Sequence, residues 1–70
     1  MLEIYIDSRG WLYKVGTSLS GNEWKIFYSK NNGKGWHSVR ACQWFDTIDA
    51  AAQDLKAYAA KKGMKLKKTV

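Results

Sequence analysis

Hydrophobic and polar residues alternate along the first two-thirds of the chain, in short segments that turn-forming residues separate. In residues 2–7 (LEIYID), Leu2, Ile4 and Ile6 fall on one side, which is the period of two typical of a half-buried strand. The same alternation recurs in three further segments, residues 11–17, 23–29 and 36–42. Stretches rich in Gly, Ser and Asn separate these segments. Short turns between successive strands predict an antiparallel meander.

The hydrophobic period changes from 2 to 3.6 in residues 45–63 (FDTIDAAAQDLKAYAAKKG). Asp46 or Thr47 can cap the first turn of a helix, and Gly63 is suited to end it. The apolar stripe of this helix comprises Ile48, Ala51, Ala52, Leu55, Tyr58 and Ala59. Because the stripe is rich in alanine, we expect the helix to pack closely on the sheet.

These patterns predict the α+β class, with an antiparallel β-meander of three to four strands followed by one C-terminal α-helix packed on one sheet face. A chain of 70 residues is near the lower size limit for a domain stabilised by its own core. Residues 1–63 are therefore predicted to form a single β-β-β-β-α domain. Residues 64–70 (MKLKKTV) follow as either a basic tail or a short edge strand.

One helix can cover only one face of such a sheet, so the other face is where we expect function. The side richer in large apolar residues is predicted to meet the helix, and it comprises Leu2, Ile4, Ile6, Trp11, Tyr13, Val15, Trp24, Ile26, Tyr28, Val39 and Ala41. The opposite face is predicted to carry Tyr5, Leu12, Lys14, Lys25, Phe27, Trp36, Ser38 and Arg40. This second face mixes cations with aromatic rings.

Composition further limits the classes of function that the chain can have. The formal net charge is +6, from 12 Lys and Arg against 6 Asp and Glu, which favours an anionic partner. One Cys and one His are too few for an internal disulfide or a four-ligand zinc site, so no metal or other cofactor is expected. The chain has no apolar run long enough to cross a membrane, and a lone thiol without a signal peptide predicts a cytoplasmic protein.

Catalysis is not expected. His37 and Cys42 have the chemistry of a base and a nucleophile, but they differ in parity along the predicted fourth strand and are expected on opposite faces. Asp46 and Asp49 suit the positive end of the helix dipole without any metal. Residues 30–36 (KNNGKGW) lack the spacing of a phosphate-binding loop and precede a strand. We therefore predict that the protein is not an enzyme.

Nucleic-acid binding is the function that the mixed face favours. Cations attract phosphates, and rings offer flat surfaces on which unpaired bases stack. The predicted contact residues are Lys14, Lys25, Phe27, Lys34, Trp36 and Arg40. An alternative is a protein-interaction or homodimerisation surface, since exposed apolar patches often mark protein contacts. A plain scaffold, with lysines that serve only solubility, is the third interpretation.

Two families have similar features. Residues 44–59 (WFDTIDAAAQDLKAYA) resemble the strand-to-helix junction, aromatic-x-Thr-x-x-x-Ala, of plant ethylene-response-factor domains and of the arm-binding domains of phage-type integrases. Those domains lay an exposed sheet face in the major groove of duplex DNA. The chain has only two arginines, Arg9 and Arg40, so the arginine-rich strands of the plant family are absent.

The order of four strands followed by a helix is also similar to the transcriptional-coactivator and Whirly class of proteins. Members of that class bind single-stranded DNA and dimerise. This second resemblance, which rests on topology and on a basic-aromatic sheet, implies nucleic-acid binding by a homodimer.

Overall fold

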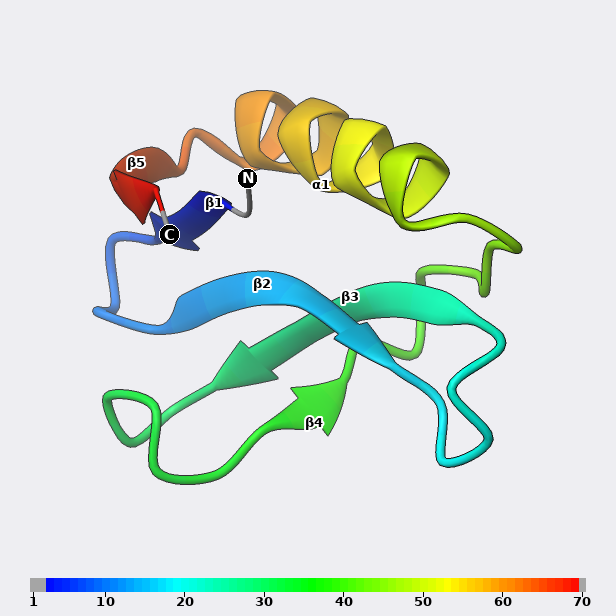
Figure 1. The fold of residues 1–70 in the computed structure, drawn as a ribbon. Helices are drawn as coiled ribbons and strands as arrows, with labels where there is room; N and C mark the ends of the chain where they lie inside the picture. The colour runs from blue at the N-terminus through cyan, green and yellow to red at the C-terminus, as the bar shows by residue number, and fades with distance from the viewer. Residues whose placement is uncertain (1–2, 70) are drawn as a thin grey trace.

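Five antiparallel strands form one sheet, and a helix lies across one of its faces (Figure 1). The structure is a computed structural model and describes residues 3–69. Its elements are β1 (Glu3–Ile6), β2 (Leu12–Thr17), β3 (Trp24–Ser29), β4 (His37–Ser38), α1 (Ile48–Lys62) and β5 (Lys65–Thr69). The strand order in the sheet is β4-β3-β2-β1-β5. The predicted α+β class, with one helix packed on one side of an antiparallel sheet, is confirmed.

The fifth strand lies beyond the helix in the sequence. Of the two alternatives for residues 64–70, the structure shows the edge strand, because β5 pairs antiparallel with β1. All five residues of β5 are exposed, and three of them are lysines. Lysines on an edge strand oppose pairing with other chains.

The fourth strand is much shorter than the predicted segment 36–42. Only His37 and Ser38 pair as strand residues with β3. The chain then leaves the sheet through a turn, which the Cys42 N–H closes by donating to the Val39 carbonyl at 3.2 Å. Ala41 lies exposed in this turn, so the prediction that it meets the helix was wrong.

Hydrogen bonds at both ends define α1. Thr47, rather than Asp46, is the N-cap, and its Oγ1 accepts a hydrogen bond from the Ala50 N–H at 3.2 Å. Gly63 ends the helix with φ of 70°, a left-handed conformation that glycine adopts without the steric penalty of a Cβ. The predicted boundaries of the helix are thereby confirmed.

Small helix residues let α1 lie close to the sheet. Ala51, Leu55 and Ala59 are buried, whereas Ile48 at the start of the predicted stripe remains 39% exposed. The buried core comprises Tyr5, Tyr13, Val15, Ile26, Ala51, Leu55 and Ala59. The helix-facing positions predicted for β2 and β3 are confirmed, since each of them is buried or packs against this core.

The facing of β1 differs from the prediction. Tyr5 pairs with Tyr13 and is 8% exposed on the helix side, so Ile4 and Ile6 lie half-buried on the opposite face. The Tyr5 hydroxyl donates to the Glu3 carboxylate at 2.8 Å, which satisfies the polar end of a ring that is otherwise buried. A shift of one residue in register reverses every side chain of a strand, and apolar alternation alone did not reveal it. Leu2, predicted on the helix side, lies outside the described residues.

Candidate nucleic-acid interface

The sheet face opposite α1, which we call the helix-free face, collects four lysines from three strands, β2, β3 and β5. Cross-strand partners point to the same side of a sheet, so the pairing register assigns the residues of each face. The strand positions of the helix-free face are Ile4, Ile6, Leu12, Lys14, Gly16, Lys25, Phe27, Ser29, Ser38, Lys65 and Lys68. Four of these described positions are lysines, and none is Asp or Glu.

Two tryptophans stand over this face, next to two of its lysines. The Lys14 Nζ lies 4.4 Å from the ring centroid of Trp36, and the Lys25 Nζ lies 5.3 Å from that of Trp44. Phe27 lies edge-on to Trp44, with ring centroids 6.2 Å apart and planes at 71°. The helix-free face is therefore a row of rings and cations that alternate.

Of the six residues predicted from the sequence, the structure brings four together on this face: Lys14, Lys25, Phe27 and Trp36. Lys34 and Arg40 lie exposed in the loops before and after β4. Tyr5, predicted on the same face, lies on the helix side.

Part of the helix-free face is covered by the chain itself. The Ser29 Oγ accepts hydrogen bonds from the backbone N–H groups of Asn31 and Gly33, and Ser29 is fully buried. Leu12 is only 6% exposed, because the loop between β3 and β4 lies over it. Lys25 is 8% exposed. The accessible part of the face is consequently centred on Lys14 and on the side toward β1 and β5.

Trp44 and the β5 lysines were missing from the prediction. Trp44 reaches this face because its neighbour Phe45 forms an isolated bridge with Trp24, which returns the chain to the edge of β3. Lys65 and Lys68 pair with Ile6 and Ile4, with a register shift between the two pairs. Both placements depend on long-range pairing, and neither segment alternates in a way that indicates it.

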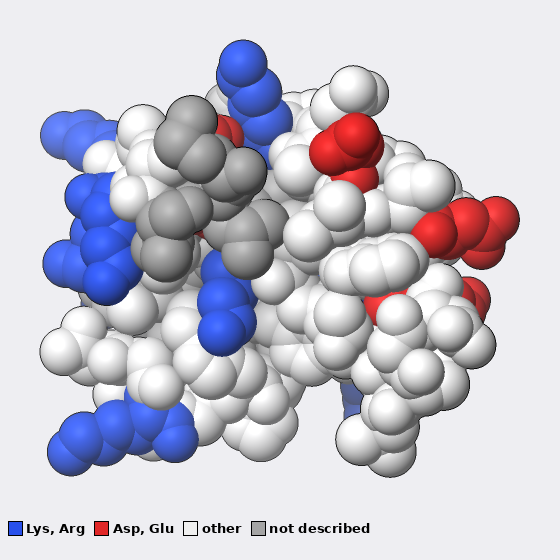
Figure 2. Space-filling model, in the orientation of Figure 1, with Lys and Arg blue, Asp and Glu red and all other residues white. Residues whose placement is uncertain are grey.

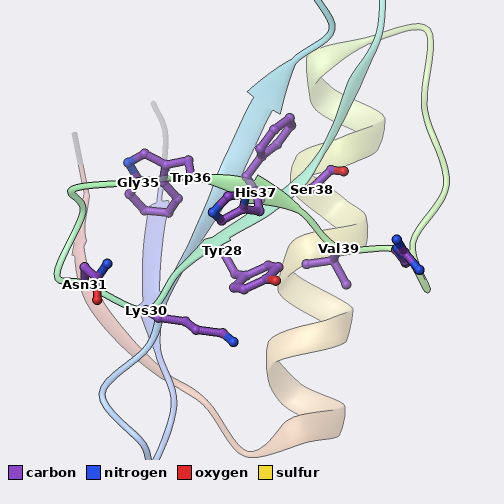
Figure 3. A pocket seen from close by; sticks show the side chains of 10 residues that line it. Tyr28, Lys30, Asn31, Gly35, Trp36, His37, Ser38 and Val39 are labelled. Carbon is purple, nitrogen blue, oxygen red and sulfur yellow. The ribbon is translucent and has the colours of Figure 1, made fainter.

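A shallow hollow of about 830 Å³ lies beside β4 (Figure 3). Tyr28 and His37 lie close together there, with ring centroids 5.9 Å apart. Lys30 and Arg40 both line the hollow, and Trp36, which also lines it, joins it to the helix-free face. The combination of cations and aromatic rings therefore continues from the helix-free face around the β4 edge of the sheet.

Charges of opposite sign occupy different parts of the surface. In Figure 2, Lys and Arg gather on the side of the molecule that holds β5, whereas Asp and Glu lie mainly on the side where α1 begins. An anionic ligand is attracted toward the side that holds β5.

The helix side has a cation-ring cluster of its own, held by a carboxylate. The Arg9 guanidinium lies 3.5 Å from the ring centroid of Trp11 and forms a salt bridge with Asp7 at 2.8 Å. The Tyr13 hydroxyl donates to the same carboxylate at 3.0 Å. Burial and the Asp7 carboxylate raise the pKa of Tyr13 to about 12. Burial also acts to raise the pKa of Asp7, but hydrogen bonds from Arg9, Trp11 and Tyr13 outweigh it and lower that pKa.

His37 and Cys42 do not lie on opposite faces, so that prediction was wrong. His37 pairs with Tyr28, and Cys42 packs against the core, so both lie on the helix side, because the chain leaves the strand between them. Burial raises the pKa of the Cys42 thiol, which disfavours the reactive thiolate.

Among residues 3–69, no three His, Cys, Asp or Glu side chains gather as metal ligands do. Helix α1 has 15 residues, and no helix in this part of the chain is long and apolar enough to span a membrane.

Comparison of the chain with protein-family models, with curated proteins and with solved structures gives no match. The geometry and charge of the helix-free face are therefore the features from which a function can be inferred.

Proposed function

We propose that this domain binds nucleic acid through its helix-free face and catalyses no reaction. The observation that carries the proposal is the set of four lysines, with no acidic residue, at the described strand positions of that face. Lysines that neutralise phosphates release condensed counterions, and this release supplies most of the affinity of non-specific binding. Rings beside the lysines offer bases a surface for stacking.

Protection against aggregation does not account for two of these lysines. Lysine commonly blocks the edges of sheets, which explains those on β5. Lys14 and Lys25, however, lie on β2 and β3, which have neighbouring strands on both sides. Among the described residues, neither of them pairs with a carboxylate. Lys14, the more accessible of the two, is thus a cation beside a ring in the middle of the sheet, an arrangement that suits an anionic, aromatic ligand.

Titration of a labelled oligonucleotide at low salt and at about 0.15 M salt tests the proposal. We expect the affinity to fall steeply as salt rises. The double variant Lys14→Gln/Lys68→Gln should reduce the slope of log affinity against log salt by about one unit per lysine. The matched control is Lys56→Gln/Lys61→Gln, which removes the same charge from exposed positions of α1 and should change the slope less.

Absence of binding at low salt would overturn the proposal, as would equal effects of the two double variants. A second measurement addresses the alternative of a homodimerisation surface. If sedimentation shows a tight dimer that Phe27→Ala or Trp36→Ala dissociates, the rings of this face serve self-association instead. A cytoplasmic location, expected from the lone thiol, is compatible with nucleic-acid binding.

A further inference from the structure

The two tryptophans of the helix-free face stand beside opposite ends of β3, too far apart to contact neighbouring bases of one stack. Trp44 precedes Phe45, which bridges Trp24, so it stands beside the Lys25 end of β3. Trp36 precedes His37, which pairs with Tyr28, so it stands beside the other end of that strand. Four residues of a strand span about 13 Å. Successive bases in a stacked strand are separated by only about 3.4 Å.

The ring planes also differ in direction. The planes of Phe27 and Trp44 meet at 71°, so their faces cannot both continue one parallel stack of bases. Trp44 is 39% exposed, which leaves its indole accessible to a planar ligand. A ligand that uses these rings must therefore present its bases one at a time, splayed away from their neighbours.

The helix-free face has few of the side-chain types that read base edges. Besides lysine, serine and threonine, the side chains that read base edges in the major groove are arginine for guanine, asparagine and glutamine for adenine, and Glu and Asp for cytosine. None of the described strand positions of this face carries any of them. Its polar groups are lysines and serines, and lysine meets phosphates as a point charge. The face is thus better suited to contact a backbone and to stack bases than to read a sequence.

Building on the proposed function, we propose that the ligand is single-stranded nucleic acid, bound with little dependence on sequence. Bases stack on Trp44 and on the accessible part of Trp36, and Lys14, Lys65 and Lys68 contact the phosphates. A duplex cannot use the rings, because the faces of its bases are covered by their neighbours in the stack.

Three ligands of equal length test this inference at one salt concentration: labelled oligothymidylate, a duplex, and an abasic strand that keeps the phosphates but has no bases. We expect oligothymidylate to bind at least about 10-fold more tightly than the abasic strand, because one stacked base alone contributes about a factor of 10. The duplex should bind more weakly than oligothymidylate, although it carries more charge.

Variants of Trp44 locate the stacking. Trp44→Leu should weaken oligothymidylate binding by about 10-fold and leave binding of the abasic strand unchanged. Trp44→Phe keeps a ring and should restore most of the affinity. Circular dichroism of each variant separates loss of stacking from loss of fold.

The outcomes distinguish this inference from the proposed function. If all three ligands fail to bind at low salt, nucleic-acid binding itself is wrong. If the duplex or the abasic strand binds as tightly as oligothymidylate, or if Trp44→Leu weakens the abasic strand equally, the single-strand inference is wrong and the proposed function stands.

Discussion

On the helix side of the sheet, the Arg9 guanidinium lies 3.5 Å from the ring centre of Trp11, and on the helix-free face the Lys14 ammonium lies 4.4 Å from that of Trp36. The two pairs look alike, yet their surroundings differ. Asp7 forms a salt bridge with Arg9, whereas no described carboxylate pairs with Lys14. A neutralised cation contributes to the fold, while a cation without a counter-charge remains able to attract an anion.

The same division holds for the two faces as a whole. The core lies between the sheet and α1, and Ile26 at its centre is fully buried. On the helix-free face the loop between β3 and β4 covers the region near Leu12 and Ser29, and Lys25 is also largely buried. We therefore expect substitutions on the helix side to change the free energy of unfolding, and substitutions on the helix-free face to change binding.

The largest expected effect is on the core. Ile26→Ala removes a fully buried side chain and leaves a cavity between β3 and α1. We expect it to lower the free energy of unfolding by about 2–5 kcal/mol, as measured by denaturant titration. A loss below about 1 kcal/mol would mean that α1 packs on the sheet less closely than the structure shows.

Asp7→Asn should lower the free energy of unfolding by about 2 kcal/mol at neutral pH. The Asp7 carboxylate accepts hydrogen bonds from two backbone N–H groups, the Arg9 side chain and the Tyr13 hydroxyl, and hydrogen bonds to charged groups each contribute about 1.5–3 kcal/mol. The neutral amide still accepts some of these bonds but loses the charge. Thermal unfolding of the two proteins at neutral pH measures the difference.

This substitution should also change the pH dependence of stability. Because the folded-state pKa of Asp7 lies below its ordinary value of 3.8, the carboxylate stabilises the fold above that value. The stabilisation is lost as the pH falls through the lowered pKa. The difference between the wild-type protein and Asp7→Asn should therefore shrink on acidification, and a difference that stays constant would contradict the assigned role of Asp7.

Gly16→Ala should cost about 1 kcal/mol, because a Cβ at this position would lie 2.6 Å from the Phe27 ring and force it to move. Gly35→Ala is the matched control, since no atom lies within 4 Å of a Cβ at that position. Denaturation of both variants measures the contrast. Equal stability would mean that Phe27 packs loosely on β2 and that the row of rings is not fixed by the sheet.

The sequence was sufficient to predict what depends on neighbours along the chain. Alternation placed Ile26 and Phe27 on opposite faces, and cap residues located α1. Pairing between distant segments was harder to predict from the sequence. The facing of Tyr5 follows from its register with Tyr13, which the turn at Asp7 helps to set.

The residues of the candidate interface also divide into those that the sequence could predict and those that depend on long-range pairing. Lys14, Lys25 and Phe27 lie on two long strands whose alternation is regular, so their shared face was predictable. Trp44 depends on an isolated bridge after an irregular turn, and Lys68 depends on a register shift. Neither feature has a local sequence signal, because an irregularity of one residue reverses the facing of everything that follows it.

The smallest expected effect on stability separates the two cation-ring pairs directly. Lys14→Gln removes a cation from a partly exposed tryptophan without leaving any described carboxylate unpaired, so we expect it to lower the free energy of unfolding by less than about 1 kcal/mol. Its effect on oligonucleotide affinity at low salt should be the larger one. If Lys14→Gln instead destabilised the fold as much as Asp7→Asn does and left binding unchanged, Lys14 would be a structural residue like Arg9. The difference between the two faces would then be one of position in the sheet rather than of role.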